Sequence, residues 1–112
     1  MSAVVTDVDD TLAALADPIR RRIVEMLRER PHRAGELAAA FAVTAPAVSR
    51  HLRVLRRSGL VEEHGIDADA RVRIYHLRPD PLVALRAWVD QVQSFWSDQL
   101  DAFREHIERG EQ

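Results

Sequence analysis

The chain has 112 residues, no cysteine, 46% hydrophobic residues and 30% charged residues, a composition typical of a soluble globular domain with one core. The lack of cysteine excludes disulfides, thiolate metal sites and a cysteine nucleophile. No apolar run approaches the roughly 18 to 20 residues that span a bilayer, and the acidic N-terminus does not fit a signal peptide. We therefore expect a cytoplasmic protein without a membrane partner.

Charge is distributed unevenly along the chain. Residues 1–17 hold four Asp and no Arg, residues 18–73 hold twelve Arg against seven acids, and residues 74–112 hold four Arg against seven acids. The formal net charge of −2 therefore hides a basic middle segment between two acidic ends. A basic segment of this kind favours a nucleic-acid partner.

Apolar spacing and capping residues predict four helices before residue 60. The first covers about residues 6–16 and the second runs from Pro18 to about residue 30, with Asp17 as its N-cap. The third covers about residues 34–41, and its N-cap is not obvious. Thr44 is the predicted N-cap of the fourth, which ends near residue 58 because Gly59 supplies the stop.

The fourth helix has an apolar face and a cationic face. At about 100° per residue, Val48, Leu52 and Leu55 fall together and are predicted to enter the core. The opposite side carries Pro46, Arg50, Arg53 and Arg57. An Arg-rich helix face is most often only a solvated surface, so its neighbours in the fold must decide its role.

Residues 60–77 predict a β-hairpin. A strand from residue 60 to about 66 precedes a polar turn over 67–70, and residues 71–77 alternate as a returning strand. Pairing Ile66 with Arg71 would place His64 opposite Arg73, so we do not expect His64 and His76 to form a zinc pair.

The residues after 80 predict one long helix, to about residue 108. It carries large apolar residues at every third or fourth position, and we call this set the apolar seam: Leu82, Leu85, Val89, Val92, Trp96, Leu100, Phe103 and Ile107. Such a helix would be about 40 Å long at about 1.5 Å per residue, too long for a small body to cover. We therefore expect a homodimer, with an interface formed by Val8, Leu12, Leu15, Leu85, Val89, Val92, Trp96, Leu100 and Phe103.

Together these elements predict a mainly α protein with a small β-hairpin, a single winged helix-turn-helix domain. Its parts are two dimerisation helices (6–16 and 80–108), a helix-turn-helix (34–58) and a wing (60–77). The fourth helix would enter the major groove of double-stranded DNA while the third braces it. The predicted DNA-binding residues are Thr44, Ala45, Pro46, Ser49, Arg50, His51, Arg53, Arg56, Arg57, Arg71 and Arg73. For His51, a structural role is an equal alternative to a phosphate contact.

Five segments resemble the arsenic-repressor (ArsR) family of bacterial winged-helix regulators. They are residues 15–23 (LADPIRRRI), 35–38 (GELA), 45–55 (APAVSRHLRVL), 58–61 (SGLV) and 73–77 (RIYHL). The tail looks like a subgroup whose last helix is long. The resemblance implies a homodimer, built by the first and last helices, that binds an inverted-repeat operator and represses by occluding the promoter.

The chain departs from the family's metalloid sensors at one place. Where those carry a Cys-x-Cys pair after Glu-Leu, this chain has Ala38 and Ala40, so thiolate sensing is excluded there. The acids and His106 of the last helix lack the usual ligand spacing, and we predict no metal and no cofactor. An unknown small molecule or partner protein could act as effector.

Enzyme functions are not supported, because the chain lacks a Gly-rich phosphate loop, a nucleophile elbow and a His-Glu-x-x-His run. The competing hypothesis is a winged-helix adaptor that binds another protein and no DNA.

Overall fold

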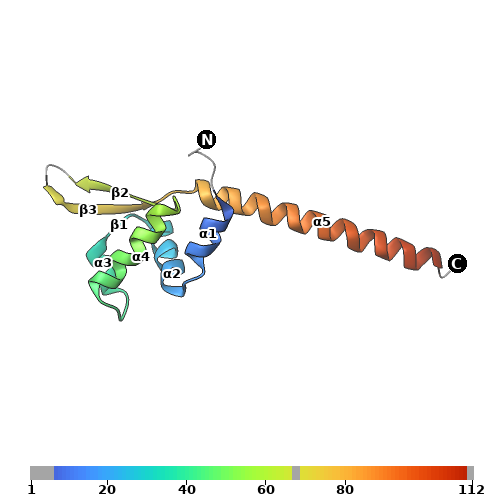
Figure 1. Cartoon of the computed structure of the whole chain (residues 1–112), viewed down its shortest axis with the longest axis horizontal. Coiled ribbons are helices and arrows are strands. Elements are labelled where there is room, and N and C mark those ends of the chain that lie inside the picture. The colour runs from blue at the N-terminus through green and yellow to red at the C-terminus, as the bar shows by residue number, and fades with distance from the viewer. Residues whose placement is uncertain (1–6, 67–68, 111–112) are drawn as a thin grey trace.

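The computed structural model describes residues 7–66 and 69–110 of the chain. The elements in order are α1 (Val8–Leu15), α2 (Pro18–Glu29), β1 (His32–Arg33), α3 (Ala34–Ala39), α4 (Ala45–Arg57), β2 (Val61–Ile66), β3 (Asp69–Leu77) and α5 (Asp80–Gly110). Helices α1 to α4 and the hairpin form a small body, from which α5 projects (Figure 1). The predicted fold class, a mainly helical winged helix-turn-helix with its hairpin between α4 and α5, is confirmed.

Side-chain caps fix the starts of the body helices. The carboxylate of Asp17 accepts hydrogen bonds from the backbone N–H groups of Ile19, at 2.8 Å, and Arg20, at 3.2 Å. Thr44 Oγ1 accepts from the N–H of Ala47 at 3.2 Å, as its predicted capping role requires. At α3, the Glu36 carboxylate reaches back to the N–H of the N-cap residue Arg33 at 3.0 Å.

The end of α3 comes earlier than predicted, at Ala39 instead of residue 41. The N–H groups of Ala40 and Phe41 bond to carbonyls three residues back, at 3.2 Å each, which tightens the last turn into 3₁₀ geometry. At the end of α4, Gly59 adopts φ +81° as the helix gives way to β2. A side chain disfavours that left-handed conformation, so glycine suits this stop.

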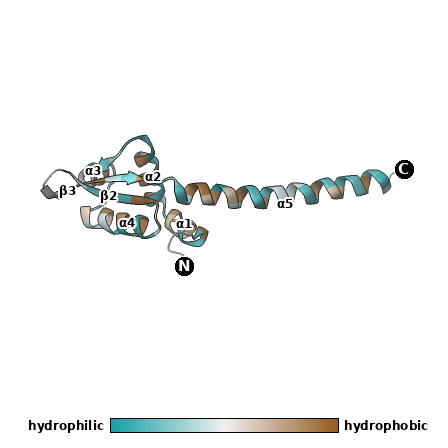
Figure 2. Cartoon of the chain, turned by 90° about the horizontal axis from the view of Figure 1, so that it is seen from above, coloured by the Kyte–Doolittle hydropathy of each residue, from teal (hydrophilic) through white to brown (hydrophobic). Residues whose placement is uncertain are grey.

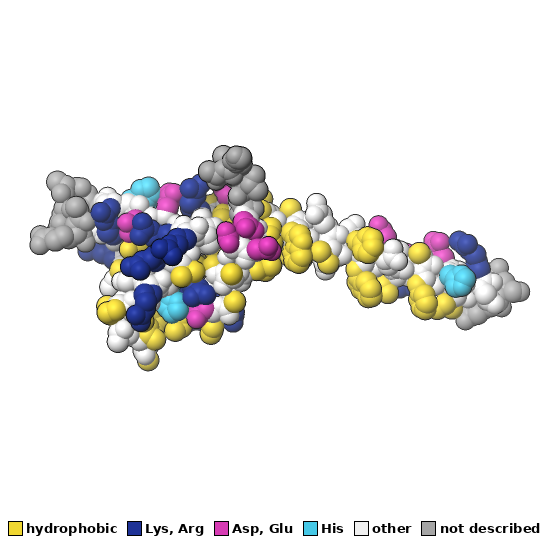
Figure 3. Space-filling model, viewed as in Figure 1, with side chains coloured by type: hydrophobic (Ala, Val, Ile, Leu, Met, Phe, Trp, Pro, Cys, Tyr) yellow, Lys and Arg dark blue, Asp and Glu magenta, His cyan; other side chains and the backbone are white. Residues whose placement is uncertain are grey.

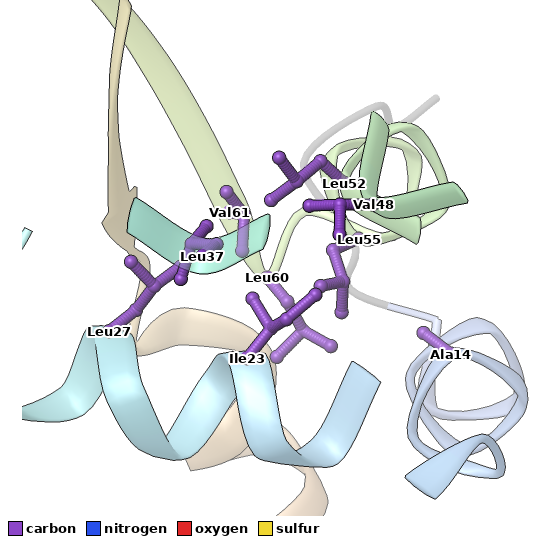
Figure 4. Packing of buried hydrophobic residues seen from close by; sticks show 9 residues of the cluster. All are labelled: Ala14, Ile23, Leu27, Leu37, Val48, Leu52, Leu55, Leu60 and Val61. Atoms are coloured by element: carbon purple, nitrogen blue, oxygen red, sulfur yellow. The ribbon is translucent and has the colours of Figure 1, made fainter. Parts of the chain in front are cut away.

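The core lies where α2, α3, α4 and the start of β2 meet, with α1 at its margin (Figure 4). Its predicted α4 members, Val48, Leu52 and Leu55, are all buried. The remaining buried hydrophobic residues are Ala14, Ile23, Leu27, Leu37, Leu60 and Val61. This packing turns the opposite, polar face of α4 to solvent.

The sheet has three strands in the order β1-β3-β2, and the short β1 was not predicted. Its residue His32 pairs with Tyr75 of β3 in antiparallel register. The predicted hairpin register is wrong, because His64 pairs with Ile74, Arg73 lies opposite Gly65, and a bulge between Gly65 and Ile66 takes up the difference.

Helix α5 is fully covered only at its start. Pro81 is buried and Leu82 packs against the core, whereas every residue from 86 to 110 is exposed. The ribbon of α5 alternates between apolar and polar residues along its length (Figure 2), and the projecting helix stretches the described chain to 75 Å in its longest dimension. None of the helices in the described ranges combines the length and hydropathy that crossing a membrane needs.

Candidate nucleic-acid interface

The outer face of α4 presents a cationic surface. Arg50, Arg53 and Arg57 are exposed and, within the described residues, none of the three forms a salt bridge. Basic side chains gather over α4 on the face shown in Figure 3. Their guanidinium groups are therefore available for phosphate oxygens or guanine edges, the two targets that Arg binds bidentately.

The start of α4 is open to a close approach by another molecule. Ala45, Pro46 and Ser49 are exposed and short, and so is the capping residue Thr44. The Thr44 hydroxyl already accepts from Ala47 N–H, so its oxygen holds the helix end in place. Backbone and helix can therefore come near a duplex without a long side chain in between.

Arg56 differs from the other three arginines of α4. Its Nη2 lies 3.3 Å from Glu63 Oε1 on β2, and the Glu63 side chain is only 21% exposed. Burial, together with the neighbouring Glu63 carboxylate, raises the pKa of Tyr75. Arg56 thus fastens α4 to the wing, a role that the sequence pattern did not indicate, and we still predict that it also contacts phosphate.

The wing carries the remaining predicted basic residues. Arg73 is exposed on β3, opposite Gly65 of β2. Arg71 lies on the same strand, but its side chain is outside what the structure describes. Their assignment to DNA therefore stays a prediction.

His51 lies on the side of α4 that faces α2, and it is half-buried. Its Nδ1 lies 3.3 Å from Nη1 of Arg20 on α2. Partial burial would raise the pKa of Asp17, but the N–H bonds from Arg20 and Ile19 and the nearby His51 and Arg20 side chains hold it below its usual value. Arg20 was not predicted as a site residue, because no local sequence signal joins positions 31 apart.

The wing histidines are closer to each other than the predicted register implied. The ring centroids of His64 and His76 lie 4.9 Å apart in an edge-to-face arrangement. The bond from His64 Nε2 to Glu62 Oε1, at 2.9 Å, lowers the pKa of Glu62, with Arg78 adding to the effect. Across the described ranges, no group of three or more His, Cys, Asp or Glu side chains is arranged to hold a metal ion.

The predicted dimer residues fall into two groups. Val8, Leu15 and Leu85 are half-buried within the chain itself. The others are exposed, namely Leu12, Val89, Val92, Trp96, Leu100 and Phe103. On α1, the fully buried positions are Thr11 and Ala14, whereas Leu12 is 43% exposed. Hydrophobic side chains line the visible face of α5 (Figure 3).

Helices α3 and α4 with the hairpin that follows them define a winged helix-turn-helix, a motif in which the second helix of the pair typically enters the major groove of DNA. Residues 17–63 match the family model described as "Bacterial regulatory protein, arsR family". The HTH-type transcriptional regulator Rv2034 of Mycobacterium tuberculosis is 42% identical over 100 residues, which are 89% of this chain and 88% of that protein. The chain belongs to the arsR family of bacterial regulatory proteins.

Solved structures agree with this assignment. The ArsR family transcriptional regulator RHA00566 superposes with a TM-score of 0.73 at 31% identity, covering 80% of this chain and 90% of that one. An ArsR-like transcriptional regulator from Rhodococcus sp. RHA1 gives a TM-score of 0.76 at 26% identity, covering 88% and 90%. The resemblance found in the sequence is thereby confirmed.

Family membership also settles the general activity. The chain is a DNA-binding transcriptional regulator and not an enzyme. This confirms the predicted function class and removes the basis for an adaptor that binds no DNA.

Proposed function

We propose that this protein is a homodimeric repressor that acts in the cytoplasm on an inverted-repeat operator. The observation that carries the proposal is that one chain presents two separate exposed surfaces. One is the cationic face of α4, where Arg50, Arg53 and Arg57 are exposed and form no salt bridge with any residue that the structure describes. The other is the part of the apolar seam from Val89 to Ile107, which is exposed and needs a partner.

The energetics of the seam favour self-association. Phe103 is 62% exposed and Trp96 is 61% exposed. Burying a large apolar side chain contributes about 1.5 to 3 kcal/mol, so covering half of the seam would contribute several kcal/mol. Across a two-fold axis, Leu12 and the seam of each copy can pack against Leu12 and the seam of the other. One interface then covers the apolar surface of both copies.

A dimer of this kind would set the spacing of the DNA site. Two symmetry-related α4 helices in successive major grooves require half-sites about 10 to 11 base pairs apart, or a small multiple of that distance. Occupation of such a site within a promoter would exclude the polymerase, which is the repression that we propose.

Two measurements test the proposal directly. Light scattering coupled to size-exclusion chromatography should give twice the 12.7 kDa chain mass. A footprint on fragments selected from the source genome should show two half-sites related by symmetry. A monomer, or a single asymmetric half-site, would contradict the dimeric repressor.

We propose a non-thiol effector for this regulator. Ala38 is half-buried and Ala40 exposed at the end of α3, and neither offers a ligand atom. Micromolar arsenite or zinc should therefore leave the DNA complex intact, with a small organic molecule or a partner protein as the signal. A stoichiometric zinc site coupled to DNA affinity would contradict this part of the proposal.

A further inference from the structure

Arg20 connects three helices through one guanidinium group. Its Nε donates to the carbonyl oxygen of Ala14 at 2.7 Å and its Nη2 donates to that of Ala13 at 3.2 Å, both at the end of α1. Its Nη1 lies 3.3 Å from His51 Nδ1 on α4. Arg20 itself lies in the first turn of α2, where Asp17 accepts from its backbone N–H. The side chain therefore joins α1 to α4 across α2.

The contact fixes which nitrogen of His51 carries the proton. A guanidinium group has only donors, so His51 Nδ1 must accept in this contact and cannot be protonated. The neutral imidazole then carries its proton on Nε2, which becomes a donor at the opposite edge of the ring.

The position of His51 on α4 suits an N–H donor to DNA. It lies on α4 next to Arg50, in the helix that carries the exposed cationic face, and is half-buried instead of fully exposed. Anchoring by Arg20 limits the freedom of the ring, so less entropy is lost when a partner binds. A phosphate oxygen is the acceptor that a duplex offers in greatest number at the edge of a groove.

We propose that Arg20 is a positioning residue for DNA binding, which holds His51 as a neutral Nε2–H donor to a backbone phosphate of the operator. The inference rests on the proposed operator binding and adds a specific role for two residues.

The first test reads the tautomer without DNA. Nitrogen-15 spectra at pH 8, where free imidazole is neutral, should show an unprotonated Nδ1 and a protonated Nε2 for His51, assigned by comparison with the His51→Asn variant. In Arg20→Gln this fixed pattern should give way to mixed tautomers. A protonated Nδ1 in the unmodified protein, or an unchanged pattern in Arg20→Gln, would overturn the proposal.

The second test reads DNA affinity and its salt dependence. His51→Asn keeps an acceptor for Arg20 but removes the distal donor, so affinity should fall about ten- to a hundredfold for each half-site, the usual effect of one hydrogen bond to a charged group. The slope of affinity against salt should not change, because a neutral donor releases no counterion. A slope reduced by about one would mean that His51 binds as a cation, which would overturn the proposal.

Matched variants separate positioning from a general loss of fold. Arg20→Gln should weaken binding about as much as His51→Asn, and the double variant should be no weaker than either. Arg21→Gln is the control, because Arg21 Nη1 also bonds to a carbonyl of α1, that of Leu15 at 2.8 Å, and among the described residues it forms no hydrogen bond with His51. Additive losses, or an equal loss in Arg21→Gln, would overturn the role of Arg20.

Failure of the proposed operator binding would look different. The unmodified protein would then show no symmetric footprint, while the nitrogen spectra would still decide whether Arg20 fixes the tautomer. In that case the phosphate contact is overturned together with the operator.

Discussion

The winged body and α5 use the same spacing of apolar residues and bury them very differently. Leu55, on α4, has no exposed surface, whereas Trp96, on α5, is 61% exposed. Periodicity specifies that a helix forms and which of its faces is apolar. Burial requires another element opposite that face, and the body supplies one for α4 but not for most of α5. The body therefore covers its own apolar residues, while most of α5 leaves them exposed, and we propose that a second copy covers them.

The largest expected effect comes from placing charge on the seam. Changing Trp96 and Leu100 together to Asp should give a monomer whose DNA binding falls to the nonspecific level, about a thousandfold or more. The reason is that a monomer no longer holds two α4 helices together on one operator. Neither Trp96 nor Leu100 needs to touch DNA for this effect. Light scattering and a binding titration measure both properties.

The control for that experiment adds the same charge elsewhere on α5. Ser94 and Ser97 lie outside the seam. Changing both to Asp should therefore leave a dimer with nearly full affinity for the operator. If the variant with Asp at positions 96 and 100 still formed a soluble dimer, the seam of α5 would not be the dimer interface.

The next effect concerns the body core. Leu55→Ala should lower the free energy of unfolding by about 2 to 5 kcal/mol, because it leaves a cavity among well-packed neighbours. Val54→Ala is the matched change on the exposed side of α4, where Val54 is 37% exposed, and it should cost much less. Urea denaturation measures both, and similar losses at the two positions would contradict a completed core.

A smaller effect separates the arginines of α4. Arg50→Ala should cost about 1 to 3 kcal/mol of operator binding and relax the choice of one base pair. Arg57→Ala should weaken all sequences alike and reduce the salt slope by about one. Binding titrations over several salt concentrations and operator variants distinguish them. If neither change alters specific binding, another element reads the groove.

The smallest effect is confined to the start of α3. The bond from the backbone N–H of Arg33, aided by Arg30, lowers the pKa of Glu36 below its usual 4.5. A carboxyl whose pKa is lowered in the folded state stabilises the protein when the pH is above the group's usual pKa. This stabilisation is lost as the pH falls through the pKa of the folded state. Glu36→Gln should therefore be slightly less stable than the unmodified chain at pH 7, and the difference should shrink progressively as the pH falls below 4.5. A difference that persists in acid would exclude a charge effect.

Much of the body could be predicted because its signals are local. The caps at Asp17 and Thr44 and the stop at Gly59 each act within a few residues, and the structure shows each in that role. The apolar face of α4 follows from its periodicity alone. The long α5 was predicted on the same ground, and it ends at Gly110, two residues beyond expectation.

The predictions from sequence failed where the local structure depends on residues that are distant in the chain. Strand β1 exists because β3 lies beside it, and two residues between helices carry no strand signal of their own. The bulge at Gly65 moved the hairpin register, which placed His64 next to His76. At the candidate interface, the pairing of Arg56 with Glu63 and of Arg20 with His51 depends on packing between elements. Helical periodicity could place these residues on a face but could not name their partners.

Strand β1 also constrains the order in which the protein can fold. The pairing of His32 with Tyr75 closes a loop of chain that contains both α3 and α4. Closing a long loop costs entropy before the contact returns any stability, which slows folding. We therefore expect α3, α4 and the wing to form in one cooperative step.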